Sequence, residues 1–179
     1  MKKIGIIIAS VLLTNSLVFS QKYKVAESKV VFFSEALIEN ITASNTSSAG
    51  LFNSENGEIA FVIPIDKFEF EKSLMKEHFN EKYMHTEKYP KASFSGKLSG
   101  YNLALKGIQN VQVQGKLTIH GVTKEITVKG TFEKKGNAIQ LDAKFPVKLE
   151  DYKVERPKLL WENIAEIVEV TVDFNFNKQ

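Results

Sequence analysis

The chain has 179 residues and a formal net charge of +3, which is small for a protein of this size. The near balance of 24 basic and 21 acidic residues gives no reason to expect nucleic acid as a partner. The sequence contains no cysteine, which excludes disulfides, lipid attachment through a thiol and a cysteine nucleophile.

Residues 1–20 have the pattern of a secretory signal peptide. Lys2 and Lys3 are followed by the apolar run 4–13, and we expect cleavage after the small residue Ser20. The alternative is an uncleaved membrane anchor, although the apolar run is shorter than the ~20 residues that a spanning helix needs. Removing 20 of the 179 residues leaves 159, and removing two lysines lowers the net charge from +3 to +1. We expect this mature protein to be periplasmic or secreted.

Residues 21–179 are expected to form one domain that consists mostly of β-strands. Apolar residues recur at every second position over long stretches, which is typical of strands with one buried face. The clearest of these stretches are 59–65, 92–98, 111–119, 126–132, 139–149 and 168–176.

The stretch 115–130 predicts a long hairpin that turns at His120 and Gly121. A two-residue loop at this turn pairs Ile119 with Val122, whereas a four-residue loop shifts the pairing. Either even loop length keeps the apolar residues of both arms on one face, and Gly121 supplies the positive φ that such a turn favours.

Residues 30–37 are apolar on both alternating faces, so we expect the interior of the fold to cover one face and a helix or loop to cover the other. The candidate cover is the segment 71–90, in which Ser73 is a plausible helix cap and Pro90 ends the region. The residues at helical spacing in this segment are Leu74, Met75, His78 and Phe79. Residues 151–166 interrupt the strands again and could hold a turn, a short helix or a lid.

The pattern predicts an all-β fold with one helical insertion and about eight largely sequential antiparallel strands. Such strands close into a barrel or stack as a sandwich, and we favour a barrel because long strands make a tall structure. Small inward residues in a tall barrel either leave room for a guest or allow the strands to bend. These residues are Ala92, Gly96, Gly115, Gly130 and Ala143.

Three segments, in this order along the chain, resemble the YceI family of exported bacterial proteins. They comprise a strand that leads to Ser73, Met75, His78 and Phe79, then Tyr89-Pro90 shortly before Phe94, and finally Gly115, Leu117-Thr118-Ile119 and Gly121-Val122-Thr123-Lys124. The resemblance extends roughly from residue 23 to the C-terminus.

The resemblance implies an eight-stranded antiparallel, lipocalin-like barrel whose lumen holds a long-chain amphiphile, such as an isoprenoid or a fatty-acyl lipid. An eight-stranded barrel is just wide enough for one small ligand, and each buried methylene of such a ligand contributes ~0.8 kcal/mol. We therefore expect a non-catalytic lipid-binding protein. The residues expected to line its lumen are Ile59, Phe61, Phe94, Leu117, Ile126, Val128, Phe145, Val170, Val172 and Phe174.

The sequence has no motif that indicates catalysis or metal binding. A GxSxG elbow and a glycine-rich phosphate loop are both absent from it, so we expect neither an enzyme nor a bound cofactor. The three histidines are His78, His85 and His120. His78 and His85 could share a helix face, but without cysteine or an HExxH motif they do not indicate a metal site.

Two further residues are candidates for contact with an amphiphile. Lys124 belongs to the inward set near the end of the hairpin, where it could meet an anionic head group or extend to solvent. Trp161 could close the opposite region of the barrel, contact a lipid tail or simply pack against its neighbours.

The alternative interpretation is a barrel that is filled by its own side chains and acts as a structural or protein-interaction module of the cell envelope. The 13 phenylalanines favour this reading, because aromatic rings can fill a narrow lumen. An apolar outer patch of Val30, Phe32 and Ala36 could support a homodimer. The sequence has no hydrophobic stretch after the signal peptide that would predict stable insertion in a membrane.

Overall fold

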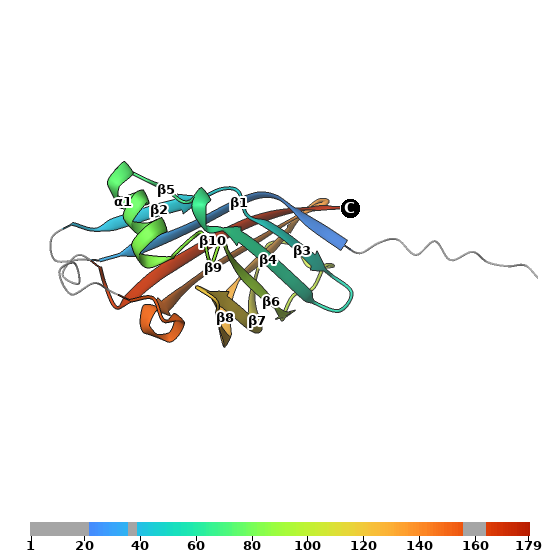
Figure 1. Ribbon diagram of the computed structural model, residues 1–179. Coiled ribbons are helices and arrows are strands. Elements are labelled where there is room, and N and C mark those ends of the chain that lie inside the picture. Colours follow the sequence, from blue (N-terminus) through green and yellow to red (C-terminus); the bar gives the residue numbers. More distant parts are fainter. Residues whose placement is uncertain (1–21, 36–38, 156–163) are drawn as a thin grey trace, which may run out of the picture.

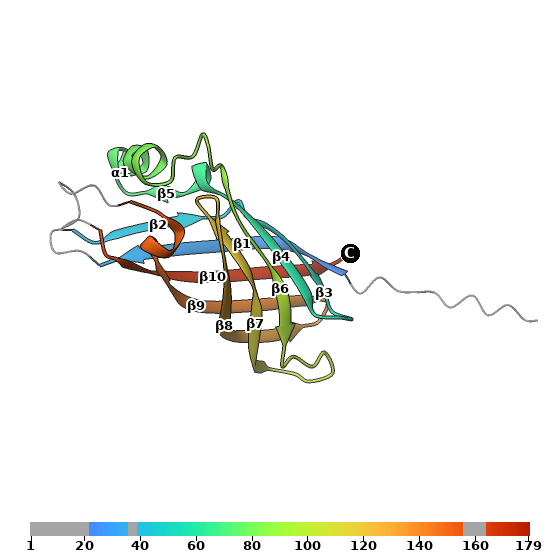
Figure 2. The same cartoon turned by 60° about the horizontal axis from the view of Figure 1, so that its bottom comes forward.

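The computed structural model describes residues 22–35, 39–155 and 164–179, which form strands and a few short helical turns (Figures 1 and 2). The strands are β1 (Lys22–Ser34), β2 (Ile41–Asn45), β3 (Ala49–Asn53), β4 (Glu58–Pro64), β5 (Glu69–Phe70), β6 (Lys91–Ser99), β7 (Ile108–Ile119), β8 (Val122–Lys135), β9 (Ala138–Lys148) and β10 (Ile167–Lys178). The helical elements are η1 (Ile65–Lys67), α1 (Ser73–His78), the π-helical turn η2 (Phe79–Tyr83) and η3 (Leu149–Tyr152). The expected signal peptide, Ala36 and Trp161 lie outside the described residues.

The strands form a closed antiparallel barrel, as the alternation of the sequence predicts. Strand β1 pairs with β10 on one side and, on the other side, with β2 along one half and β3 along the other half. The two short strands β2 and β3 therefore occupy one position in the wall. The next position is shared in the same way by β4, which pairs with β3, and β5, which pairs with β2. The ten strands thus make an eight-stranded barrel, which confirms the predicted fold and not the sandwich.

The hairpin of β7 and β8 has the shorter of the two loops that the sequence allows. Ile119 pairs with Val122, so the loop consists of His120 and Gly121 alone. Both loop residues have positive φ, 51° and 74°, which is the conformation of the two-residue turns that fit the twist of a hairpin.

Two of the small inward residues serve close packing and do not create room. Gly96 and Gly115 lie opposite each other on β6 and β7. A Cβ added to Gly96 would lie 2.8 Å from the ring of Phe94, and one added to Gly115 would lie equally close. Each Cβ would also lie less than 2.5 Å from a backbone oxygen of the neighbouring strand. The glycines therefore let the two strands approach and let the Phe94 ring lie over them.

The predicted helical insertion is present, but two details of the prediction are wrong. Lys72 is the residue before the first turn of α1 and Ser73 lies inside the helix, so Ser73 is not its cap. The insertion also does not cover the outer face of β1. The ring of Phe79 stacks on Phe32 at 5.4 Å, and Phe32 points into the barrel. The insertion therefore lies over one end of the barrel, as Figure 2 shows.

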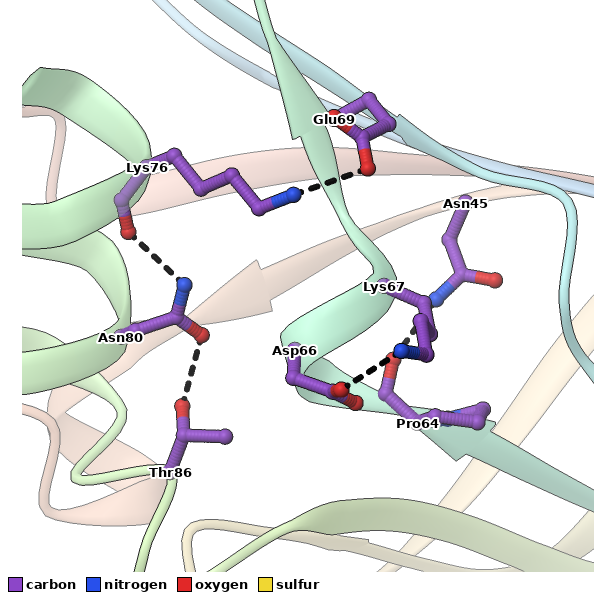
Figure 3. A network of polar contacts seen from close by, with 8 residues as sticks. All are labelled: Asn45, Pro64, Asp66, Lys67, Glu69, Lys76, Asn80 and Thr86. Carbon is purple, nitrogen blue, oxygen red and sulfur yellow. Dashed lines mark hydrogen bonds and ion pairs between the residues drawn. The ribbon is translucent and has the colours of Figure 1, made fainter. Parts of the chain in front are cut away.

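Polar contacts fix this insertion to the wall where β2 and β3 separate (Figure 3). The fully buried Asn45 donates from Nδ2 to the carbonyl of Pro64 at 2.7 Å. Lys76 of α1 forms an ion pair with Glu69 of β5 at 2.8 Å. Asn80 donates to the carbonyl of Lys76 and accepts from the hydroxyl of Thr86, which ties α1 to the segment that follows η2.

The surface patch suggested for a homodimer is not on the outside of the barrel. Val30 is buried, and both Val30 and Phe32 face the lumen. The alternation of these residues along β1 is compatible with either the inner or the outer face of the barrel. The contacts of Phe32 with Phe68, Phe70 and Phe79 show that they lie on the inner face. In the part of the chain that the structure describes, no helix is long and apolar enough to span a membrane.

Candidate ligand-binding site

The half of the barrel beneath the helical insertion encloses an apolar cavity of about 380 Å³. Its wall is formed by the inward residues of β4 and β6 to β10, together with Val30 and Phe32 of β1. Cross-strand pairs such as Val170 with Phe145 continue this surface without a break from one strand to the next. The volume lies within the range of ~300–1,000 Å³ that is usual for small-molecule sites.

The structure brings together nine of the ten residues that the sequence predicts for the lining. These are Phe61, Phe94, Leu117, Ile126, Val128, Phe145, Val170, Val172 and Phe174. The exception is Ile59, which is buried but does not reach the cavity. Ile59 lies two residues before Phe61 on the same face of β4, and it pairs with Phe52 in the filled half of the barrel.

That filled half is packed by an aromatic cluster of Phe52, Tyr101, Phe132 and Phe176. The exposed fractions of Phe52, Phe132 and Phe176 are 1%, 0% and 0%. Phe52 lies at the centre, and its ring centroid is 5.3–6.2 Å from those of the other three. The hydroxyl of Tyr101 donates to the carbonyl of Ser54 at 2.9 Å, which holds the loop between β6 and β7 against this end. The aromatic cluster therefore closes the barrel at the end opposite the helical insertion.

The helical insertion covers the half of the barrel that contains the cavity, and it does so with apolar side chains. Met75 and Phe79 line the cavity, whereas Leu74 on the other side of α1 is 58% exposed. Phe32 contacts Phe68 and Phe70 as well as Phe79, so four phenylalanines meet under the insertion. Of the four residues at helical spacing in the sequence, Met75, His78 and Phe79 therefore line the cavity and Leu74 does not.

A few polar residues lie among the apolar ones that line the cavity, namely Ser34, Glu39, His78, Tyr83, Asp142 and Tyr152. Burial raises the pKa of the Tyr83 hydroxyl, and burial and the charge of Asp151 raise that of Tyr152, so both stay neutral near pH 7. The buried hydroxyl of Ser34 accepts a hydrogen bond from the amide of Ala165 at 2.9 Å. These groups can offer hydrogen bonds to the polar end of a ligand.

Lys124 does not take part in this cavity. Its backbone keeps the inward register and pairs with Leu117, but its side chain is exposed and does not line the cavity. It stands only two residues from the start of β8, where the barrel wall ends.

His78 and His85 do not share a helix face, although the sequence allowed it; His85 instead pairs with His120. His78 lines the cavity, whereas His85 lies beyond the helical insertion and meets His120 of the hairpin loop. Nδ1 of His85 and Nε2 of His120 are 2.8 Å apart. These residues are 35 positions apart, and both have positive φ in the structure. The sequence predicts His120 as a turn residue, but it carries no signal that His85 meets it. No group of three or more potential metal ligands was found among the residues that the structure describes.

Comparison with known proteins agrees with this architecture. The sequence profile of the YceI-like domain matches residues 22–176. A polyisoprenoid-binding domain from Saccharophagus degradans, implicated in plant cell wall breakdown, has 18% identity and a TM-score of 0.76, and the match covers 88% of this chain and 98% of that one. BcnA from Burkholderia cenocepacia has 19% identity and a TM-score of 0.70, with 83% and 95% covered.

A YceI protein from Campylobacter jejuni is also similar, with 15% identity, a TM-score of 0.56 and coverage of 99% and 94%. No curated protein matches the chain. At these identities the solved structures show a shared fold.

Proposed function

The chain belongs to the YceI-like family, and we propose that its barrel binds a long-chain amphiphile, an isoprenoid or fatty-acyl lipid, without catalysing a reaction. The observation that carries the proposal is the apolar cavity of about 380 Å³. The similar domain from Saccharophagus degradans is described as polyisoprenoid-binding, which supports the same class of ligand here.

The chemistry of the wall suits a hydrocarbon chain. Water leaves both the chain and the apolar lining on binding, and each buried methylene contributes ~0.8 kcal/mol. The few polar groups at the cavity, such as Tyr83 and Tyr152, would fix the orientation of the head group and add little affinity.

We place this activity outside the cytoplasm, in the periplasm or in the medium. The basis is the signal-peptide pattern of residues 1–20, with a basic start, an apolar run and a small residue before the expected cut. Sequencing the N-terminus of the protein recovered from a periplasmic extract would test this, because cleavage predicts that the mature chain begins with Gln21.

The direct test of the proposed function is extraction of the purified protein with organic solvent, followed by mass spectrometry of the extract. In parallel, the protein is titrated with a fluorescent fatty acid. We expect one amphiphile per barrel in the extract or, after delipidation, saturable uptake of the probe. If the extract contains no amphiphile and the probe does not bind, the proposal is wrong.

A matched pair of variants locates the binding inside the barrel. Val128 points into the cavity and Thr127, its neighbour on β8, is exposed on the outer face. Val128→Trp fills the lumen and should weaken uptake of the probe at least tenfold, whereas Thr127→Trp should leave it within twofold. Equal binding by both variants would place the probe on the outer surface.

The alternative, a sealed structural or interaction module, fits only half of the molecule. The aromatic cluster fills one end of the barrel with side chains, as that reading requires. The other half contains the cavity, and for this reason we favour a binding protein.

A further inference from the structure

Two stacked rings form the floor of the cavity. Phe61 of β4 and Phe174 of β10 both line it, and their ring centroids are 4.1 Å apart with an angle of 16° between the planes. The two strands are not neighbours, because β3 and β1 lie between them in the wall. The rings therefore reach toward each other across the lumen.

Small residues on the intervening strands make this stack possible. Gly50 of β3 pairs with Phe61, and a Cβ at this glycine would lie 2.5 Å from the Phe61 ring. On β1, the residue opposite Phe174 is the small, buried Ser28. Larger side chains at these two positions would occupy the space that the rings use.

The packing below the stack leaves no space for a ligand. Phe176 contacts Phe61 and Phe174 from below, with centroid distances of 6.0 and 6.4 Å. Beneath it follow Phe52 and Phe132, which are almost completely buried and do not line the cavity. A chain that enters from the open end must stop at the stacked rings.

We infer that the Phe61–Phe174 stack sets the length of hydrocarbon that the barrel can bury, at about 15 carbon atoms. This inference rests on the proposed function. An apolar cavity of ~150 Å³ accommodates the six carbons of benzene. On that scale a cavity of about 380 Å³ holds about 15 carbons, which is three isoprene units or a fatty-acyl chain of ordinary length. A longer chain leaves its remainder outside the barrel.

The test is a series of saturated fatty acids with ten to twenty carbons, each measured by displacement of the fluorescent fatty acid. In the delipidated wild-type protein, we expect affinity to rise by up to about fifteenfold for every two carbons while the chain still lengthens inside the cavity. Beyond about 15 carbons the affinity should reach a plateau, because further methylenes stay in water. A steady rise through twenty carbons would overturn the inference.

Variants of the floor should move the plateau in both directions. Phe174→Ala removes one ring of the stack and should shift the plateau to chains about four to six carbons longer, which is the size of the lost ring. Val172→Phe places a ring one step closer to the mouth on the same face of β10 and should shift the plateau to shorter chains. If Phe174→Ala does not fold, Phe174→Leu and Val172→Phe still test the inference.

The matched control is Phe132→Ala. This substitution removes the same ring from the aromatic cluster below the floor, where the side chain does not line the cavity. It should weaken folding without moving the plateau. If Phe132→Ala and Phe174→Ala shift the plateau equally, the stack is not the floor. If the wild-type protein binds none of the fatty acids and no fluorescent probe, the proposed function itself fails.

Discussion

His85 and His120 join the segment after the helical insertion to the tip of the β7–β8 hairpin, through a hydrogen bond of 2.8 Å between Nδ1 and Nε2. Two imidazoles can share such a bond only while at least one of them is neutral, because two imidazolium rings would both be donors. Nδ1 of His120 lies 3.3 Å from the carbonyl of Tyr152, so the same ring also contacts η3. Three segments around the open end of the barrel therefore meet at one titratable ring.

This contact predicts a loss of stability at mildly acidic pH. Burial lowers the pKa of His120, and the charge of His85 acts in the same direction, against the hydrogen bond to the carbonyl of Tyr152, which raises it. The folded-state pKa of His120 lies below the unfolded value of ~6.5. Between these two pKa values the unfolded state therefore binds more protons than the folded state. The stabilisation is therefore complete above about pH 6.5 and is lost as the pH falls toward the folded-state pKa.

We expect the melting temperature of the wild-type protein to fall between pH 7.5 and pH 5.5 by about 2–4 °C more than that of His120→Asn, which corresponds to roughly 1 kcal/mol. Asparagine tolerates the positive φ of 51° at this position, so the variant removes the ring and keeps the turn. Thermal unfolding at both pH values checks the prediction. An identical fall in both proteins would assign the pH dependence to other groups.

Asn45 should be among the most sensitive polar residues of the barrel. Its side chain donates to the carbonyl of Pro64 and accepts from the amide of Ser47 and the hydroxyl of Ser48, which joins the wall where β2 gives way to β3. Asn45→Ala removes three hydrogen bonds from a fully buried position and takes a partner from the buried hydroxyl of Ser48, so it should lower the free energy of unfolding by about 2–4 kcal/mol. Urea denaturation measures the loss.

The control for Asn45 is Asn56→Ala, which removes an exposed side chain that accepts one hydrogen bond from the amide of Glu58. A surface loss of this kind should cost less than about 1 kcal/mol. If the two substitutions lower the free energy of unfolding equally, the hydrogen bonds of Asn45 at the junction of β2 and β3 contribute no more to stability than an exposed one.

Gly121 should tolerate alanine less well than Gly136, another glycine of a two-residue hairpin loop with positive φ. Both Gly121 and Gly136 lie in two-residue loops, with φ values of 74° and 63°. A Cβ at Gly121 would lie 2.5 Å from the Tyr89 ring, whereas one at Gly136 would meet nothing within 4 Å. Gly121→Ala should therefore destabilise the protein by about 1–3 kcal/mol more than Gly136→Ala, as measured by urea denaturation.

The double variant Gly121→Ala/Tyr89→Leu provides a check on the cause. A smaller side chain at position 89 should remove part of the additional cost of Gly121→Ala, because the clash involves the ring. If the additional cost is unchanged in the Tyr89→Leu background, the contact with this ring is not its source.

The alternation of the sequence predicts which residues face inward, and it does so well because a strand that slips by one residue exposes its whole apolar face. It does not distinguish an inward residue that lines a void from one that fills it. Ile59 and Phe61 share one face of β4, yet only Phe61 reaches the cavity. The difference arises from Phe52, which enters from another strand and fills the space beside Ile59.

Contacts between distant segments escape the sequence for a related reason. Nothing local to Phe32 indicates that its ring meets Phe79 at the open end, and the apolar pattern of β1 is equally compatible with an outer patch. The pairing of His85 with His120 likewise depends on how the helical insertion folds back over the barrel. The cap of α1 fails for a simpler reason, because the helix starts one residue earlier than Ser73 would allow.

The aromatic cluster at one end gives the barrel the shape of a cup, which constrains how cargo can be exchanged. With Phe132 and Phe176 fully buried at the closed end, loading and release must use the same rim. Under the proposed binding function, an incoming molecule could not displace a bound one from behind, so a new lipid would enter only after the old one had left. Turnover is then governed by the rate of departure, and a higher concentration of competing lipid would not speed it up.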